Sequence, residues 1–442
     1  MAAGRKNIIC FFLTAGLLIA CPAFCSSDYG YIDISNPFLR KIPLAVPLFK
    51  TLNDGYQEKQ IAKEASSLLS ESLEFTGYFK IINRNTYLID RKNYNIVIPA
   101  IKFKNWTVIG SELLITGGIS IDEDIVKMEL RLYDTFKEKL LVGKRYKGLK
   151  DDYRKMIHRF CGEVIYQLTG KQGFFNSKIA FVSTGTGNKE IFICDFDGHN
   201  PKQFTYSKNI TLSPAWSSDA KWIAYTSYAK GNPDLYIKHL KEKRGTVVSK
   251  KGINVSPSWF PGKFALAATL SFSGDPEIYL LTGAGKIIKK LTDNWGIDVS
   301  PAWSPDGRKI AFVSNRSGTP QIYLKDLYTK RVERLTFQGR YNTTPSWSPN
   351  GDKIAYSSSD NGKFNIYVIG IDGREMTQLT RNSGNNESPS WSSDGSMIVF
   401  SSTREGRSRL YVMTVCGADQ RRLLALPGDQ TDPAWSPRIT DN

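Results

Sequence analysis

Six tryptophans recur at an almost constant interval through the C-terminal two-thirds of the chain. Each follows a Pro-Ala or Pro-Ser pair, and most precede a turn of the Ser-Pro-Asp-Gly type. They are Trp216, Trp259, Trp303, Trp347, Trp391 and Trp435, so the gaps are 43 residues once and 44 residues four times. A repeat of about 40–45 residues is typical of the blades of a β-propeller.

The unit between two tryptophans has room for four strands. After Trp303, proline and glycine form a tight turn, because proline fixes φ and glycine accepts a positive φ. Alternating apolar residues then predict strands over 309–314, 321–324 and 331–336. Together with the short Pro-Ala-Trp strand, this gives the four strands of one blade.

The two ends of the repeat predict how the ring closes. The first copy begins at Lys178 without a preceding tryptophan strand, and the last tryptophan strand, 432–437, has no strands after it. We therefore expect the C-terminal strand to complete the blade begun near residue 178, which removes the exposed edges of an open array. The predicted fold is an α+β multidomain chain: a small α/β domain over 26–172, then a closed six-bladed β-propeller over 173–442.

Residues 26–172 lack the repeat and read as mixed α/β. Asp151 is expected to cap a second helix that runs to Leu168. The other predicted elements are strands over 42–49, 78–82, 113–121, 126–133 and 140–146, and a first helix over 54–75.

The first 25 residues have the pattern of a secretion signal. Arg5 and Lys6 precede an apolar stretch over 8–20 that is short for a membrane span, and small residues follow it. Cleavage around 23–26 would leave a chain without a membrane span. A lipoprotein-type alternative, with Cys21 lipidated, stays open.

The sequence contains little catalytic or metal-binding chemistry. It has three histidines, no nucleophile elbow, no P-loop and no metal-type cysteine spacing. We therefore expect a protein that is not an enzyme and has no cofactor or metal. The net charge of +17 suits an anionic partner or simply a basic surface. No nucleic-acid-binding module is recognisable.

One set of polar residues predicts a binding surface. If the tryptophan strand is innermost, the residues three before each repeat proline ring one mouth of the channel, next to a mixed apolar and polar set. The candidates for partner binding are Thr211, Asn254, Val255, Asp298, Val299, Asn342, Thr343, Asn386, Glu387 and Gln430.

The repeats, the preceding α/β domain and the leader together resemble the TolB family of the Tol–Pal system. The resemblance rests on Pro433-Ala434-Trp435-Ser436-Pro437 near the end of the chain and on Leu168-Thr169-Gly170 before the first blade. It implies a monomeric periplasmic scaffold that supports outer-membrane integrity and cell division.

The resemblance also implies two partners. A Pal-like lipoprotein would bind the propeller mouth, where Asn254, Val255, Asp298 and Val299 are candidates. A TolA-like inner-membrane protein would bind a mobile N-terminal arm. The arm candidates are Asp28, Tyr29, Tyr31, Ile32 and Asp33.

Two other functions stay open at this point. A secreted propeller hydrolase would need convergent acids, and Asp298 with Glu387 is the only nearby pair. A carbohydrate- or peptidoglycan-binding module would fit the positive charge and the many aromatic residues.

Overall fold

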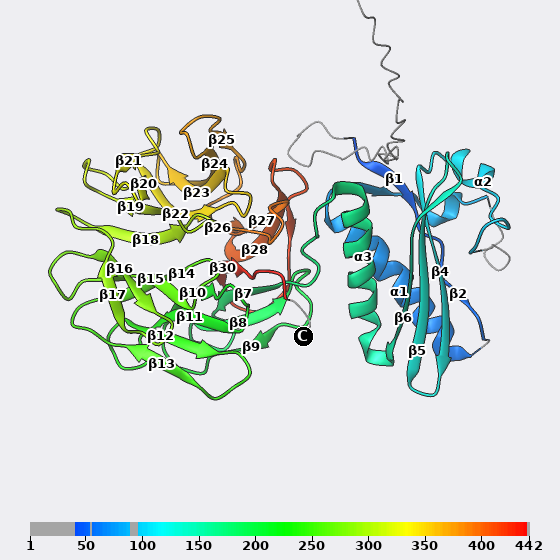
Figure 1. Cartoon of the computed structure of the whole chain (residues 1–442), viewed down its shortest axis with the longest axis horizontal. Helices are drawn as coiled ribbons and strands as arrows, with labels where there is room; N and C mark the ends of the chain where they lie inside the picture. The colour runs from blue at the N-terminus through cyan, green and yellow to red at the C-terminus, as the bar shows by residue number, and fades with distance from the viewer. Residues whose placement is uncertain (1–39, 54, 89–95, 440–442) are drawn as a thin grey trace, which may run out of the picture.

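The computed structural model describes residues 40–53, 55–88 and 96–439. It contains a mixed α/β domain and a β-propeller, which lie side by side (Figure 1). The last helix of the first domain ends at Thr169 and the first propeller strand begins at Lys178.

The N-terminal domain is built on one mixed sheet. Its strand order is β3-β1-β4-β5-β6, with β2 also paired to β4; β1 runs parallel to β3 and β4, and β4, β5 and β6 are antiparallel. The strands are β1 (Ile42–Ala45), β2 (Lys50–Thr51), β3 (Phe79–Ile81), β4 (Leu113–Asp122), β5 (Ile125–Asp134) and β6 (Lys139–Leu149). The single strand predicted over 42–49 is shorter: β1 ends at Ala45, and the next N–H, of Val46, donates to the Tyr87 hydroxyl oxygen (2.9 Å) instead of to a neighbouring strand.

Two long helices cover this sheet and contribute to its core. They are α1 (Tyr56–Phe75) and α3 (Tyr153–Thr169), which pack on each other and bury Leu69, Leu73 and Phe160. The short elements are η1 (Arg84–Thr86), α2 (Lys104–Thr107) and η2 (Lys150–Asp152). The prediction that Asp151 caps the second helix is wrong: Asp151 lies inside η2, and the residue before α3 is Asp152, whose side chain makes no cap bond.

The remainder is a ring of six four-stranded antiparallel blades, as predicted. Five blades are continuous in sequence. Their strands are β10 (Thr211–Trp216), β11 (Trp222–Ser227), β12 (Asp234–His239) and β13 (Gly245–Val248); β14 (Asn254–Trp259), β15 (Ala265–Leu270), β16 (Glu277–Thr282) and β17 (Ile287–Lys290); β18 (Asp298–Trp303), β19 (Lys309–Ser314), β20 (Gln321–Asp326) and β21 (Val332–Arg334); β22 (Tyr341–Trp347), β23 (Lys353–Ser359), β24 (Phe364–Gly370) and β25 (Thr377–Gln378); β26 (Asn386–Trp391), β27 (Met397–Glu405), β28 (Arg407–Thr414) and β29 (Arg421–Arg422).

The sixth blade, which we call the sealed blade, joins the two ends of the propeller. Its strands are β30 (Gln430–Trp435), β7 (Lys178–Ser183), β8 (Glu190–Asp195) and β9 (Lys202–Gln203), in that order. β30 pairs antiparallel with β7 and places Trp435 opposite Ile179. The predicted closure by the C-terminal strand is therefore confirmed.

The repeat tryptophans link neighbouring blades. The indole N–H of Trp259 donates to the carbonyl oxygen of Ala215 one blade earlier (3.1 Å), and Trp216, Trp303 and Trp391 make the equivalent bond. Each of these rings is buried. The core clusters around Trp259 and Trp303 contain residues of both blades, so these tryptophans pack between their own blade and the preceding one and are hydrogen-bonded to it.

Each innermost strand is kinked at the residue before its proline. These six residues have φ between 49° and 55°, and the strand register shifts there. They are Ser213, Ser256, Ser300, Thr344, Ser388 and Asp432. Such a bulge bends a strand locally, and the same residues line the central channel.

Candidate functional site

The propeller has two faces, which differ in the loops they carry. The mouth face carries the loops that lead into the innermost strands, such as 204–210, 291–297 and 335–340. The turn face carries the Ser-Pro-Asp-Gly turns and the loops between third and fourth strands. In one such turn the Asp306 carboxylate accepts bonds from the Ser304 hydroxyl and the Arg308 N–H.

The N-terminal domain docks on the turn face. Lys41 forms an ion pair with Asp419 (2.8 Å) in the loop between β28 and β29. Arg154 of α3 pairs with Asp197 (2.7 Å) in the loop between β8 and β9. In addition, the Arg421 guanidinium lies 4.0 Å from the centre of the Phe75 ring. The opposite, mouth face is where the sequence places the binding residues.

The six polar residues three before each proline are at the mouth, but they are buried. Each is the first or second residue of its innermost strand, and none is more than 1% exposed. They are Thr211, Asn254, Asp298, Asn342, Asn386 and Gln430. Because these six side chains expose almost no surface, their direct contact with a partner stays a prediction.

These buried groups hold the mouth loops in place. The Asn342 amide donates to Gln321 Oε1 (2.7 Å) of the preceding blade and to the Gln338 carbonyl oxygen (2.8 Å). Asp298 forms an ion pair with Arg316 (2.6 Å). Since buried polar groups normally need such partners, the pattern that looked like a binding ring also has a structural explanation.

The next residue along each innermost strand is only half-buried and lies at the mouth end of that strand. This set mixes aliphatic, hydroxyl and acidic side chains. It consists of Leu212, Val255, Val299, Thr343, Glu387 and Thr431. Val255, Val299, Thr343 and Glu387 therefore hold equivalent half-buried positions on four successive innermost strands, and their contact with a partner stays a prediction.

Large exposed aromatic side chains on the mouth face were not found from the sequence. Trp295, Phe337 and Tyr206 are 81%, 74% and 72% exposed, and each lies in a loop that leads into an innermost strand. The sequence signal that could have indicated them is a large aromatic residue in a loop between two predicted strands. Exposed aromatic residues of this kind are enriched at protein interfaces.

The turn-face half of the channel holds a cavity of about 360 Å³, lined by the Pro-Ala-Trp segments. Asp432 is the acidic residue in its lining, and the Glu387 carboxyl on the neighbouring blade lies within reach of its charge. Burial, followed by the nearby Asp432 charge, raises the pKa of Glu387, and burial raises the pKa of Asp432. Asp298 and Glu387 are the acid pair considered for a hydrolase. Asp298 is ion-paired with Arg316, whereas the charged group that acts on Glu387 is Asp432.

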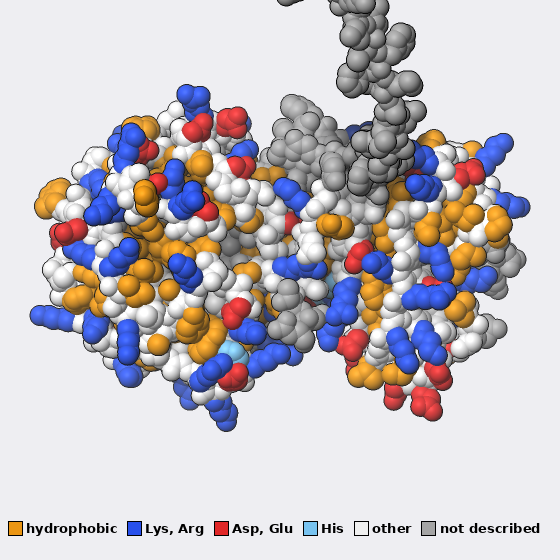
Figure 2. Space-filling model, in the orientation of Figure 1, with side chains coloured by type: hydrophobic (Ala, Val, Ile, Leu, Met, Phe, Trp, Pro, Cys, Tyr) orange, Lys and Arg blue, Asp and Glu red, His pale blue; other side chains and the backbone are white. Residues whose placement is uncertain are grey.

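Several sequence predictions fall elsewhere. The arm residues Asp28, Tyr29, Tyr31, Ile32 and Asp33 lie outside the described residues. Within 40–53, 55–88 and 96–439, no three His, Cys, Asp or Glu side chains are arranged to hold a metal ion. No helix of the same ranges has the length and apolar character to cross a membrane. Lys and Arg are scattered over both domains in Figure 2.

Comparisons with known proteins agree with this architecture. Residues 165–439 match the model of the TolB beta propeller domain, and residues 30–141 match that of the TolB amino-terminal domain. The crystal structure of TolB from Acinetobacter baumannii superposes with a TM-score of 0.79 at 30% identity and covers 90% of this chain and 97% of that one.

Curated relatives that match the chain are also named TolB. The chain is 56% identical over 283 residues to the Tol-Pal system protein TolB of Desulfosudis oleivorans, which is 64% of this chain and 65% of the relative. It is 42% identical over 249 residues to the protein TolB homolog of Chlorobium chlorochromatii, 56% of each chain. These matches span less than two-thirds of the relatives' lengths. With both domain models matched in order, the chain belongs to the TolB family, a family of non-enzymatic propeller proteins.

Proposed function

We propose that this chain is a periplasmic binding protein of the Tol–Pal system. Its propeller mouth binds a Pal-like lipoprotein, and the segment before residue 40 binds a TolA-like inner-membrane protein. In this role it supports outer-membrane integrity and constriction during cell division. The observation that carries the proposal is the mouth itself: half-buried mixed side chains at the start of the innermost strands, with exposed aromatic residues in the loops that lead into those strands.

The position of the N-terminal domain supports two separate binding regions. Its ion pairs with Asp419 and Asp197 lie on the turn face, so a lipoprotein domain at the mouth face would not compete with it for the same surface. The buried first-position residues then act indirectly, since they fix the loops that a partner touches. Preformed loops reduce the entropy lost on binding.

Affinity measurements with matched variants test the mouth. The double variant Val255→Glu, Val299→Glu adds two negative charges to half-buried wall positions. We expect its affinity for the periplasmic domain of the cognate Pal-like lipoprotein to fall by about tenfold or more in titration calorimetry, which is a hot-spot-sized effect. Tyr328→Glu is the control, because Tyr328 is exposed on the turn face between β20 and β21.

Two outcomes would contradict the proposal. If a folded Val255→Glu, Val299→Glu protein keeps its affinity, the mouth is excluded as the lipoprotein-binding site. If Tyr328→Glu loses as much affinity, the effect is one of charge alone and not of the mouth. Deletion of residues 26–36 should abolish binding of a TolA-like protein and leave the lipoprotein affinity within about twofold. Thermal unfolding of each variant separates loss of binding from loss of fold.

A further inference from the structure

Two adjacent blades, β10–β13 and β14–β17, carry a cluster of cations on the turn face. Three segments meet there: the turn between β12 and β13 (240–244), the turn between β14 and β15 (260–264), and the turn between β16 and β17 with the first residues of β17 (283–289). We call these three segments the basic rim. They hold one acidic residue, Glu242. Their six exposed cations are Lys241, Lys243, Arg244, Lys263, Lys286 and Lys289.

Contacts join the three segments of the basic rim into one surface. The Arg244 guanidinium carbon lies 5.0 Å from the centre of the Trp222 ring, and that ring lies 5.1 Å from the Phe264 ring, centre to centre. The Gly283 N–H donates to the Phe264 carbonyl oxygen (2.8 Å). The rim is therefore a single patch that spans two blades.

The segment 260–264 departs from the turn that the repeat uses elsewhere. In the other four continuous blades, a serine that follows the tryptophan bonds to an aspartate of the turn, as Ser304 does to Asp306 (2.6 Å). After Trp259 that serine is replaced by Phe260, and the segment has no acidic residue. An acidic, hydrogen-bonded turn is exchanged here for an aromatic and cationic one.

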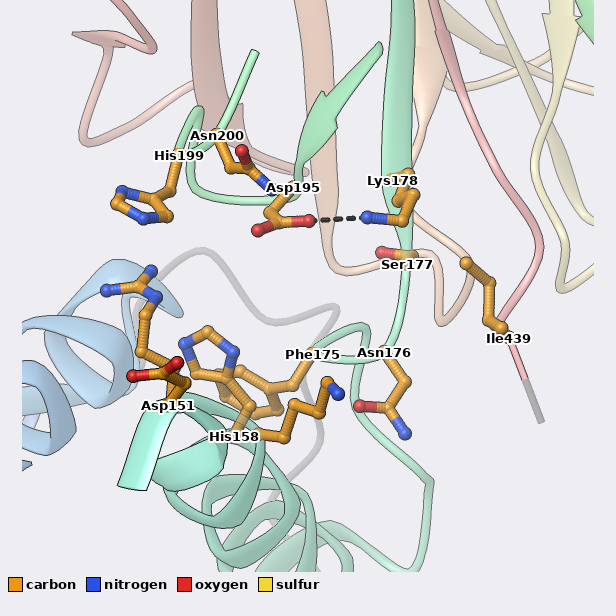
Figure 3. Close-up of a pocket in the computed structure, with 12 residues that line it drawn as sticks. Asp151, His158, Phe175, Asn176, Ser177, Lys178, Asp195, His199, Asn200 and Ile439 are labelled. Atoms are coloured by element: carbon orange, nitrogen blue, oxygen red, sulfur yellow. Dashed lines mark hydrogen bonds and ion pairs between the residues drawn. The ribbon is translucent and has the colours of Figure 1, made fainter. Parts of the chain in front are cut away.

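The lysines of the basic rim also lack the acidic partners that other turn-face cations have. In the pocket of about 390 Å³ between the N-terminal domain and the sealed blade, each lining cation is paired with a carboxylate (Figure 3). The pairs are Arg154 with Asp197 (2.7 Å), Lys155 with Asp152 (2.7 Å) and Lys178 with Asp195 (2.6 Å). On the rim Arg244 pairs with Glu242, but the five lysines form no ion pair with any residue that the structure describes. The adjoining turn between β10 and β11 adds one charge of each sign, Asp219 and Lys221, so the positive excess remains.

Apolar side chains are exposed between these cations. Phe264 is 51% exposed and Ile288 is 52% exposed, and Val247 and Ile287 are also exposed on the outermost strands β13 and β17. Lysines interspersed with exposed aliphatic and aromatic side chains are typical of protein surfaces that lie in a membrane interface.

The N-terminal domain leaves the basic rim uncovered. Its turn-face contacts go to Asp197 of the sealed blade and to Asp419 and Arg421 of the blade β26–β29. In Figure 2, Lys and Arg side chains project along the lower left edge of the propeller, in the region where Figure 1 places β13 and β17. The rim is therefore open to an extended partner.

We propose that the basic rim docks the protein on a membrane surface that contains anionic phospholipid. The lysines lie at the level of the lipid phosphates, and Phe264 and Ile288 enter the interfacial layer. Protein interfaces are enriched in arginine and depleted in lysine. Since five of the six rim cations are lysines, the composition favours lipid over an acidic protein. The inference does not depend on the partner-binding mouth, which lies on the opposite face.

Co-sedimentation with vesicles tests the proposal. The protein used begins at Ser26, because the apolar stretch 8–20 of the leader would itself bind lipid. We expect binding to phosphatidylcholine vesicles that contain about one-third phosphatidylglycerol and at least about tenfold weaker binding to phosphatidylcholine alone, since each lysine near an anionic surface contributes about fivefold in affinity. Binding to the anionic vesicles should fall as salt is raised from about 0.05 M to about 0.5 M, because ions screen the attraction.

Two variants separate the charged and apolar contributions. The triple variant Lys241→Gln, Lys243→Gln, Lys286→Gln should lower the affinity for anionic vesicles by at least about tenfold. Ile288→Thr keeps a β-branched side chain in β17 and should lower the affinity about threefold, because it removes apolar surface from the interface. All four positions are exposed, so thermal unfolding of both variants should match that of the parent.

A matched control removes the same number of charges from the opposite face of the same two blades. Lys230→Gln, Lys250→Gln, Lys251→Gln replaces three exposed lysines in the loops between β11 and β12 and between β13 and β14. Its affinity for anionic vesicles should stay within about twofold of the parent, because these lysines lie farther from the bilayer than a Debye length.

The inference is overturned if both kinds of vesicle bind equally or if the rim triple variant matches the mouth-face control. It is also overturned if Ile288→Thr keeps the parental affinity while soluble polyglutamate displaces the protein from anionic vesicles. That result would show that the rim recognises negative charge alone, as on an acidic protein, and not a lipid surface.

Discussion

The sealed blade differs from the other five in how its strands are connected. In a continuous blade the innermost strand is joined to the next strand by a short turn, such as Ser304–Lys309. In the sealed blade the equivalent pair, β30 and β7, comes from opposite ends of the propeller and is held only by noncovalent contacts.

The side chains at the seal also depart from the repeat. Four tryptophan indoles donate to a backbone carbonyl of the preceding blade, but Trp435 donates to the Ser177 hydroxyl (2.7 Å) in the segment just before β7. The kinked position, serine or threonine in the five continuous blades, is Asp432 here. At the seal, side-chain contacts and the β30–β7 ladder therefore take the place of the missing turn.

The largest effect should come from removing β30. A chain that ends at Asp429 exposes the edge of β7 and leaves the ring open, so we expect the cooperative thermal unfolding transition of the propeller to be lost. A chain that ends at Pro437 is the control, because it keeps β30 and gives up the bond from the Ile439 N–H to the Asn176 carbonyl (2.6 Å). If the shorter chain unfolds as sharply and at the same temperature as the control, the seal is not essential.

Tryptophan-to-phenylalanine substitutions should give intermediate, graded losses. Each removes ring volume, and Trp435→Phe and Trp303→Phe also remove an indole hydrogen bond worth about 1 kcal/mol. Among the described residues, Trp347 Nε1 has no partner, so Trp347→Phe should cost about 1–2 kcal/mol. We expect a loss of unfolding free energy of about 2–3 kcal/mol for Trp303→Phe and slightly more for Trp435→Phe. Urea unfolding measures the order, and a costlier Trp347→Phe would refute it.

The smallest effect concerns pH. Since the folded-state pKa of Asp432 lies above its unfolded value, its protonated form favours folding, and that contribution is lost as pH rises through the folded pKa. Asp432→Ser restores the serine of the repeat. We expect the variant to lose less stability than the parent from pH 4 to pH 8, by a difference below about 1 kcal/mol. If parent and variant lose the same unfolding free energy between pH 4 and pH 8, folding does not raise the pKa of Asp432 and the prediction is wrong.

Much of the propeller could be predicted because its signal is repeated six times. The tryptophan interval and the offset copies indicated six blades and their closure at Lys178. The positive φ at Ser213 and its equivalents could not be predicted, since serine before proline has no residue-level signature of a bulge. In the single-copy N-terminal domain, an acidic residue near a helix start was mistaken for its cap.

The candidate site was only half predictable. Sequence position identified the innermost strands and hence the mouth, but polarity did not distinguish Asn342, which is buried and hydrogen-bonded, from Thr343, which lines the opening. Neighbouring residues of a strand point to opposite sides, so one position decides between a structural and a binding role. The pocket between the N-terminal domain and the sealed blade could not be predicted, because its walls come from two domains whose relative placement the sequence does not give.

The partners at the seal are very far apart along the chain: Ser177 and Trp435 are separated by 258 positions. Contacts of such long range form slowly, because the loop entropy is lost before the contact stabilises anything. A newly made propeller must therefore wait for its final strand, with five partly formed blades and an unpaired β7. Refolding experiments should find ring closure as the late, rate-limiting event, and it is the stage at which the unpaired strand is most open to aggregation.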